Sequence, residues 1–97
     1  MQFMTQIIQN NEQWLLSGDV VFANASMLLS ESIALNFTQP TTIDFKEVTD
    51  VDTSAISLIL EWERRAKVEK ASIKFINFPQ NLVSLAKLYG VDEIIAS

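Results

Sequence analysis

A helix-like segment between two strand-like segments constrains the fold of this chain more than any other feature. Residues 54–68 repeat apolar side chains at helical spacing. The flanking runs "TIDF" (42–45) and "SIKFINF" (72–78) are rich in β-branched and aromatic residues, as strands are. A strand–helix–strand unit forms a crossover, which pairs its two strands in parallel. The sequence therefore predicts an α/β fold built on a small mixed sheet.

The residues before this unit predict two more strands and a first helix. Residues 5–9 and 13–17 are expected strands, with a turn at Asn10 and Asn11 between them, because asparagine tolerates left-handed backbone. Gly18-Asp19 is expected to end or bulge the second strand. Asn24 is the expected N-cap of the first helix, which the "TQPTT" run (38–42) breaks because proline cannot continue it.

The residues after the crossover unit predict a third helix. Pro79 suits its first turn and Gly90 its C-terminal cap, with "VDEII" (91–95) as one more helical turn. The order is then β-β-α-β-α-β-α, with about four strands and three helices. Since no repeat, linker or low-complexity segment interrupts the chain, we expect a single domain over residues 1–97.

The absence of cysteine and histidine limits the catalytic and metal-binding chemistry that is open to this chain. With neither residue in the chain, disulfides, thiolate chemistry, the usual zinc ligand sets and histidine-based catalysis are excluded. A small acid-based enzyme would have to use the carboxylates at Asp44, Glu47, Asp50 and Asp52, which are also the candidate metal cluster. No combination of base, nucleophile and orienting group is evident. We therefore expect no catalytic residue, no metal and no cofactor.

The charge and the hydropathy of the chain indicate which partners and which compartment to expect. The net charge of −5 disfavours nucleic acid, which needs basic surface against its phosphates. Five of the seven basic residues lie between Arg64 and Lys74, either as a solvated helix end or as a patch that docks an acidic partner. The start has no signal-peptide pattern, and no apolar run is long enough to span a bilayer. We expect a cytoplasmic protein.

The helix over residues 54–68 carries more apolar surface than one buried face requires. On a helical wheel, Leu58 and Trp62 fall at the margin of the apolar arc, beside Ser57, Glu61 and Arg65. A tryptophan in that place either closes the core or anchors an interface, because tryptophan beside arginine is typical of binding hot spots. These five residues are therefore candidates for a partner-binding surface.

The "VDTSAISLIL" run (51–60) resembles the signature of STAS domains, in which an aspartate, a serine or threonine and small residues open an apolar helix. The predicted element order also matches that family. Within it, "SLAKLYGVDE" (84–93) is similar to the last helix of the cytoplasmic MlaB-like subunit of Mla-type phospholipid ABC transporters. The resemblance covers nearly the whole chain.

The resemblance implies a function without catalysis. Such subunits bind the ATP-binding-cassette ATPase of a complex that also holds permease and substrate-binding subunits, and that maintains outer-membrane lipid asymmetry. The chain would then lie peripheral to the inner membrane through the complex. The alternative is an anti-sigma-factor antagonist, a phosphoswitch in which Thr53 is the candidate phosphoacceptor. In the transporter subgroup, the residue matching Thr53 lies in or near the ATPase-binding surface.

Two departures from the family pattern weaken the phosphoacceptor reading. Val21 stands where the family often has an aspartate, and Ala55 where a glycine is usual. Independently of the resemblance, Thr53 or Ser54 is expected to cap the helix, which leaves the other hydroxyl exposed. The candidate partner-binding residues are Thr53, Ser54, Ser57, Leu58, Glu61, Trp62 and Arg65.

Overall fold

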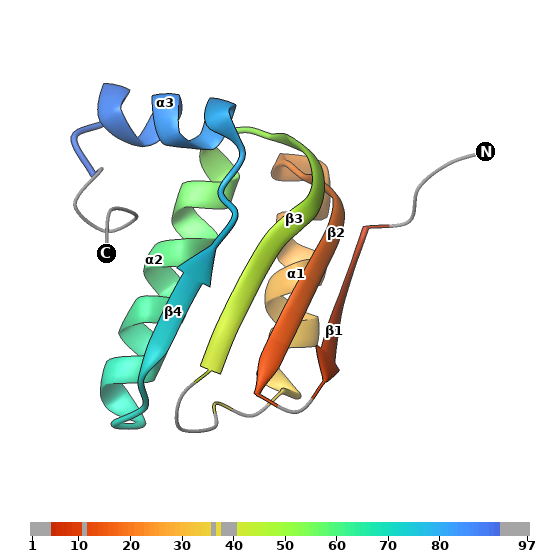
Figure 1. Ribbon diagram of the computed structural model, residues 1–97, viewed down its shortest axis with the longest axis vertical. Coiled ribbons are helices and arrows are strands. Elements are labelled where there is room, and N and C mark those ends of the chain that lie inside the picture. The colour runs from red at the N-terminus through yellow and green to blue at the C-terminus, as the bar shows by residue number, and fades with distance from the viewer. Residues whose placement is uncertain (1–4, 11, 36, 38–40, 92–97) are drawn as a thin grey trace.

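The predicted order of strands and helices is confirmed by a computed structural model, which describes residues 5–10, 12–35, 37 and 41–91. The elements are β1 (Gln6–Asn10), β2 (Gln13–Val20), α1 (Phe22–Ile33), β3 (Thr41–Val51), α2 (Thr53–Val68), β4 (Ile73–Ile76) and α3 (Gln80–Leu88). Figure 1 shows them in colours that follow the chain. In these residues no helix is long and apolar enough to cross a membrane.

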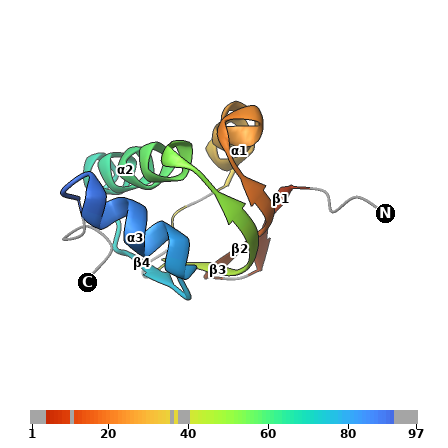
Figure 2. The ribbon, with the colours of Figure 1, turned by 90° about the horizontal axis from the view of Figure 1, so that it is seen from above.

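The four strands form one mixed sheet in the order β1-β2-β3-β4. β1 and β2 are antiparallel, whereas β2, β3 and β4 are parallel to one another. Both parallel connections advance across the sheet in the same direction, and such crossovers are right-handed. They therefore place α1 and α2 on the same face of the sheet, as the view from above shows (Figure 2). α3 lies across the end of the sheet at which β4 stops (Figure 1).

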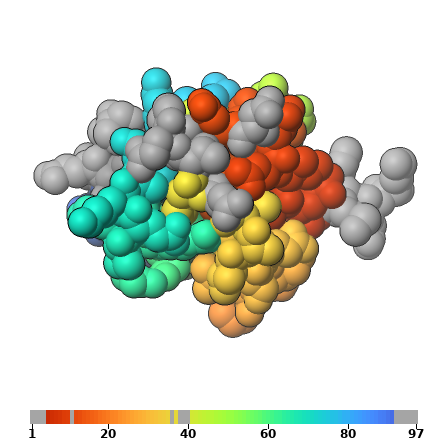
Figure 3. Space-filling view, turned by 90° about the horizontal axis from the view of Figure 1, so that it is seen from below, coloured from red at the N-terminus to blue at the C-terminus, as the bar shows by residue number. Residues whose placement is uncertain are grey.

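The core lies between the sheet and the pair α1 and α2. Trp14 is fully buried there; its ring stacks on Phe37 with 5.0 Å between centroids and meets Trp62 edge-on at 5.8 Å. Stacked and edge-to-face pairs at these separations are favourable beyond the area they bury. In the space-filling view from below, the end of α2 lies against the end of α1 (Figure 3). The two helices therefore share one core.

The end of β2 departs from the sequence-based boundary. β2 continues to Val20 instead of stopping at residue 17, because its last residues pair with β3 up to Val51. The predicted bulge is confirmed: the register shifts between Gly18 and Asp19, and Gly18 has φ +84°. At the other end, Asn10 still pairs with Gln13 and belongs to β1, so it is not part of a turn as predicted. Asn11 lies outside the described residues.

The start of α1 also differs. The helix begins at Phe22, and its N-cap is Val21, so the prediction of Asn24 as N-cap is wrong. The Asn24 side chain is used elsewhere, since its amide donates to the Asp19 carbonyl and the Thr5 hydroxyl at 3.1 Å each. Gln39 and Pro40, which were expected to break this helix, lie outside the described residues.

The third helix lies close to its predicted place. Pro79 is the N-cap of α3 and precedes the first helical residue, Gln80. Gly90 follows the C-cap with φ +70°, the left-handed conformation in which helices commonly end on glycine, as predicted. Of the predicted extra turn, only Val91 is described, and it is not helical. Residues 92–95 lie outside the described part.

Candidate functional site

The turn between β3 and α2 brings the starts of two helices to one carboxylate. Asp52 is the N-cap of α2, and its Oδ1 accepts a hydrogen bond from the Ser54 backbone N–H at 2.8 Å. Its Oδ2 accepts from the Phe22 backbone N–H at 2.9 Å, in the first residue of α1. Val21, the N-cap of α1, makes no side-chain capping bond. Asp52 thus supplies the acceptor that the valine lacks.

This arrangement corrects the capping prediction. Neither Thr53 nor Ser54 caps α2, because the residue before them does so. Thr53 is the first helical residue and is exposed. Ser54 is half-buried and faces α1. Neither hydroxyl therefore serves as the N-cap of the helix, and the Thr53 side chain is exposed to solvent.

The Asp52 carboxyl is held in its ionised form. Burial raises its pKa, but hydrogen bonds from Phe22 and from the backbone and side chain of Ser54 lower it more, so the pKa lies below its ordinary value. Backbone N–H donors at a helix start favour a negative charge. The carboxylate is therefore already engaged by the protein at neutral pH.

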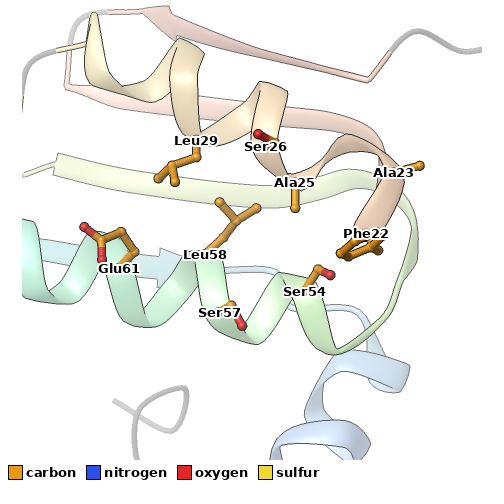
Figure 4. A pocket seen from close by; sticks show the side chains of 9 residues that line it. All are labelled: Phe22, Ala23, Ala25, Ser26, Leu29, Ser54, Ser57, Leu58 and Glu61. Carbon is orange, nitrogen blue, oxygen red and sulfur yellow. The ribbon is translucent and has the colours of Figure 1, made fainter.

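A groove runs between the first halves of α1 and α2. It encloses about 610 Å³ and is seen from close by in Figure 4. The lining residues are Phe22, Ala23, Ala25, Ser26, Leu29, Ser54, Ser57, Leu58 and Glu61. Most of the lining is apolar, and Glu61 is the only charged residue among the described residues that form it. The groove begins beside Asp52, because that carboxylate binds Phe22 at one rim and Ser54 at the other.

The structure brings together four of the seven candidate partner-binding residues. Ser54, Ser57, Leu58 and Glu61 line the groove, and Leu58 reaches from α2 toward α1 (Figure 4). Leu58 is nevertheless 4% exposed, since α1 covers that flank of the helix. Thr53 stands outside the groove, next to it in the sequence.

Trp62 does not belong to the surface. Of its two predicted roles, the structure supports the closing of the core and not the anchoring of an interface, because its side chain is 1% exposed. Its Nε1 donates to the Ser32 hydroxyl at 2.9 Å, and that hydroxyl donates to the Leu29 carbonyl. The wheel treats α2 alone, whereas α1 packs against this flank and closes the core over Trp62.

Arg65 serves the fold. Its guanidinium donates to the carbonyls of Ser32 and Leu35, at the end of α1, at 2.6 Å each. It also lies 4.5 Å from the centre of the Phe37 ring and pairs with Glu69. These contacts engage the Arg65 guanidinium, which the sequence predicts to bind a partner. They also hold the end of α1 against α2.

The acidic cluster is dispersed by the fold. Asp44 is buried on β3 and accepts hydrogen bonds from the side chains of Gln13 and Asn77. Asp50 accepts from the Val51 backbone, and Asp52 caps the helices. Among the described residues, no three acidic side chains lie close enough together to hold a metal ion.

Half of the groove was missed from the sequence. Phe22, Ala25 and Leu29 form the α1 side, and none of them is a predicted site residue. One feature of the sequence indicated this side of the groove. The run "VVF" (20–22) leads directly into a helix without a polar residue at its N-cap, so that a large aromatic side chain stands at the helix start. Phe22 is in fact 82% exposed.

Comparisons with known proteins point to one family and one fold. The family described as "Mlab, STAS domain" matches residues 7–96. No curated protein sequence matches the chain significantly. The structure of the anti-sigma factor antagonist SpoIIAA in its unphosphorylated form is similar, with a TM-score of 0.69 and 12% identity over 93% of this chain and 84% of that one. At this identity the likeness concerns the fold.

A second solved structure is similar over a part of its length. A crystal structure of Mglu has a TM-score of 0.59 and 17% identity, and the match covers 77% of this chain and 20% of that chain. The chain therefore spans about a fifth of Mglu. This likeness again concerns the fold alone.

Proposed function

The chain belongs to the STAS domain family, and on this premise we propose that it is the non-catalytic STAS subunit of a phospholipid ABC transporter. In this function it binds and supports the ATP-binding-cassette ATPase of the complex. It lies in the cytoplasm and meets the inner membrane only through its partner subunits. The transporter maintains the lipid asymmetry of the outer membrane.

The observation that carries this proposal is the exposed Thr53 beside the apolar groove. Thr53 begins α2, Asp52 fixes the backbone on either side of the turn, and the groove opens next to it. A rigid turn with one free hydroxyl and adjoining apolar surface suits a protein interface, which combines polar contacts with buried apolar anchors. The match to the "Mlab" family favours the transporter ATPase as the partner.

The second candidate is an anti-sigma-factor antagonist that switches by phosphorylation of Thr53. The exposed hydroxyl at a helix start is accessible to a kinase, and phosphate is favoured at such an end. Against this, Asp52 already occupies the Ser54 N–H, and its negative charge adjoins Thr53. A phosphate on Thr53 would be repelled by the negative charge of the Asp52 carboxylate.

The test is reconstitution with a defined ATPase. An ATP-binding-cassette ATPase subunit of a phospholipid transporter from the same organism is co-expressed with the chain carrying an affinity tag, and the two are purified together by size exclusion. We expect a stable complex and a higher yield of soluble ATPase than without the chain. Failure of the pair to associate, with an anti-sigma kinase binding instead, would replace this proposal by the phosphoswitch.

A further inference from the structure

The start of α1 leaves a large aromatic side chain in water at the rim of the groove. Phe22 is 82% exposed, although its own backbone N–H is fixed by Asp52. Leu29 and Leu58 lie deeper, between the helices (Figure 4). An exposed aromatic over an apolar cleft is typical of a surface that another molecule covers. The backbone that carries Phe22 is already ordered before any partner arrives.

The charge of the groove is negative. Within the described part of the chain, Glu61 is the one charged residue that lines the groove, and its side chain is 38% exposed. Hydrogen bonding to Arg64 holds the pKa of Glu61 below its ordinary value, so the carboxylate is ionised at neutral pH. Arg64 itself is 64% exposed and does not line the groove. α1 contains no lysine or arginine, so an incoming cation meets no basic residue on that side.

The dimensions match a helix. The lining residues span two turns of each flanking helix, 22–29 and 54–61, which corresponds to roughly 10 Å along the axes at 1.5 Å per residue. A third helix laid along such a cleft inserts side chains spaced i, i+3 or i+4, and i+7. A small molecule would be enclosed on most of its surface, whereas this groove leaves its aromatic rim in solvent.

We propose that this groove receives an amphipathic helix of the ATPase subunit. In this complex, apolar side chains of that helix pack on Phe22 and Leu29, and a lysine or arginine pairs with Glu61 in place of Arg64. The inference rests on the proposed function and names the chemistry of the partner. Pairing with Glu61 sets the position of the incoming helix along the groove, because the Asp52 carboxylate at the other end already accepts hydrogen bonds from two backbone N–H groups of this chain.

Two pairs of variants separate the groove from the rest of the surface. Glu61→Gln and Arg64→Gln break the same exposed ion pair, but only the first removes the charge of the groove. Phe22→Ala and Ile33→Ala each truncate an exposed apolar residue of α1, and only Phe22 lines the groove. The full chain is titrated with the same ATPase subunit in a calorimeter, and circular dichroism confirms that each variant is folded.

We expect Glu61→Gln and Phe22→Ala each to weaken binding by about tenfold, as loss of an interface anchor does. Arg64→Gln should bind as tightly as the wild-type chain or more tightly, because Glu61 is then free for the partner. Ile33→Ala should stay within about twofold. The loss in Glu61→Gln should shrink as salt is raised, since salt screens the pair.

The outcomes also separate this inference from the proposed function. Wild-type affinity in both Phe22→Ala and Glu61→Gln, with binding lost in a Thr53 variant, overturns the groove and leaves the function standing. An equal loss in Arg64→Gln and Glu61→Gln overturns the pairing with Glu61. No binding by the wild-type chain overturns both proposals. Movement of groove signals in nuclear magnetic resonance spectra with short-chain phospholipid, together with unchanged ATPase binding by Phe22→Ala, would assign the groove to lipid and overturn the helix.

Discussion

The carboxylate of Asp52 accepts a hydrogen bond at 2.9 Å from the backbone N–H of Phe22, a residue 30 positions earlier in the chain. The same carboxylate caps its own helix through Ser54. The first turns of both helices contain no acidic residue, so Asp52 supplies negative charge to two helix starts at once. This contact joins the two helices at one end of the groove, and the Arg65 contacts to Ser32 and Leu35 join them again beyond its other end.

Replacing Asp52 by alanine should destabilise the domain by about 2 kcal/mol. Loss of one N-cap costs about 0.5–2 kcal/mol, and this residue caps α2 and also serves the start of α1. Urea denaturation followed by circular dichroism gives the free energy of unfolding. The start of α1 should also lose protection in amide hydrogen exchange.

Glu47→Ala is the matched control, because it removes an exposed carboxylate from β3, the strand that leads into this turn. Its free energy of unfolding should stay within about 0.5 kcal/mol of the wild-type value. If Asp52→Ala proves equally mild, the bond to Phe22 contributes nothing to stability.

The stabilisation by Asp52 should depend on pH in one direction. Its pKa in the folded chain is lowered from 3.8, so the unfolded chain binds more protons through this range and stability rises with pH. The contribution is complete above the unfolded pKa and is lost as pH falls through the folded one. The difference in unfolding free energy between the wild-type chain and Asp52→Asn should therefore be constant near neutrality and shrink below about pH 4.

The other carboxylates are common to both proteins, so their titration cancels in this difference. Denaturation curves at a series of pH values between neutrality and acid measure it. A difference that grows on acidification would mean that the Asp52 carboxyl is stabilised in its neutral form.

Local patterns predicted the fold well. The helical spacing after Ser54 and the β-branched runs before and after it can each be recognised within one segment of the sequence. The crossover rule then predicts the parallel pairing of β3 and β4. The element order was likewise predicted from these patterns; it matches that of the resembled family, and the structure confirms it. The glycine ending of α3 and the bulge at Gly18 were predicted from backbone preference alone.

The site was only half predictable because it lies between two helices that are distant in sequence. A wheel of α2 shows which side chains share a flank, but not that α1 buries Trp62 and Leu58 there. Nor does it show that Arg65 turns toward α1. The Asp52 contact to Phe22 is likewise set by β2 and β3 ending side by side, which spacing within one element cannot reveal.

Arg65→Met should cost about 1.5–3 kcal/mol of stability. Methionine keeps the apolar stem but removes a charged donor from two carbonyls, and hydrogen bonds to charged groups contribute about that much. The affected carbonyls belong to Ser32 and Leu35, at the end of α1. Denaturation in urea gives the loss, and amide exchange at Ala34 and Leu35 should report the loosened helix end.

The neighbouring Arg64→Met provides the comparison. With the residues that the structure describes, Arg64 makes an exposed ion pair to Glu61, and such pairs contribute about 0–1 kcal/mol. Equal losses in the two variants would show that Arg65 stabilises the fold through charge alone and not through its bonds to α1.

Thr53 variants decide between a contact and a phosphoswitch. Because Asp52 is the cap, Thr53→Ala should change the free energy of unfolding by no more than about 0.5 kcal/mol. A contact residue then loses affinity for the ATPase subunit in Thr53→Ala, and loses more in Thr53→Glu, which buries bulk and charge in the interface. A phosphoswitch instead gives opposite effects for the two variants, since glutamate imitates the phosphorylated state. Ser54→Ala is measured beside them by calorimetry: wild-type affinity in both Thr53 variants, with loss only in Ser54→Ala, would move the contact to the hydroxyl that lines the groove.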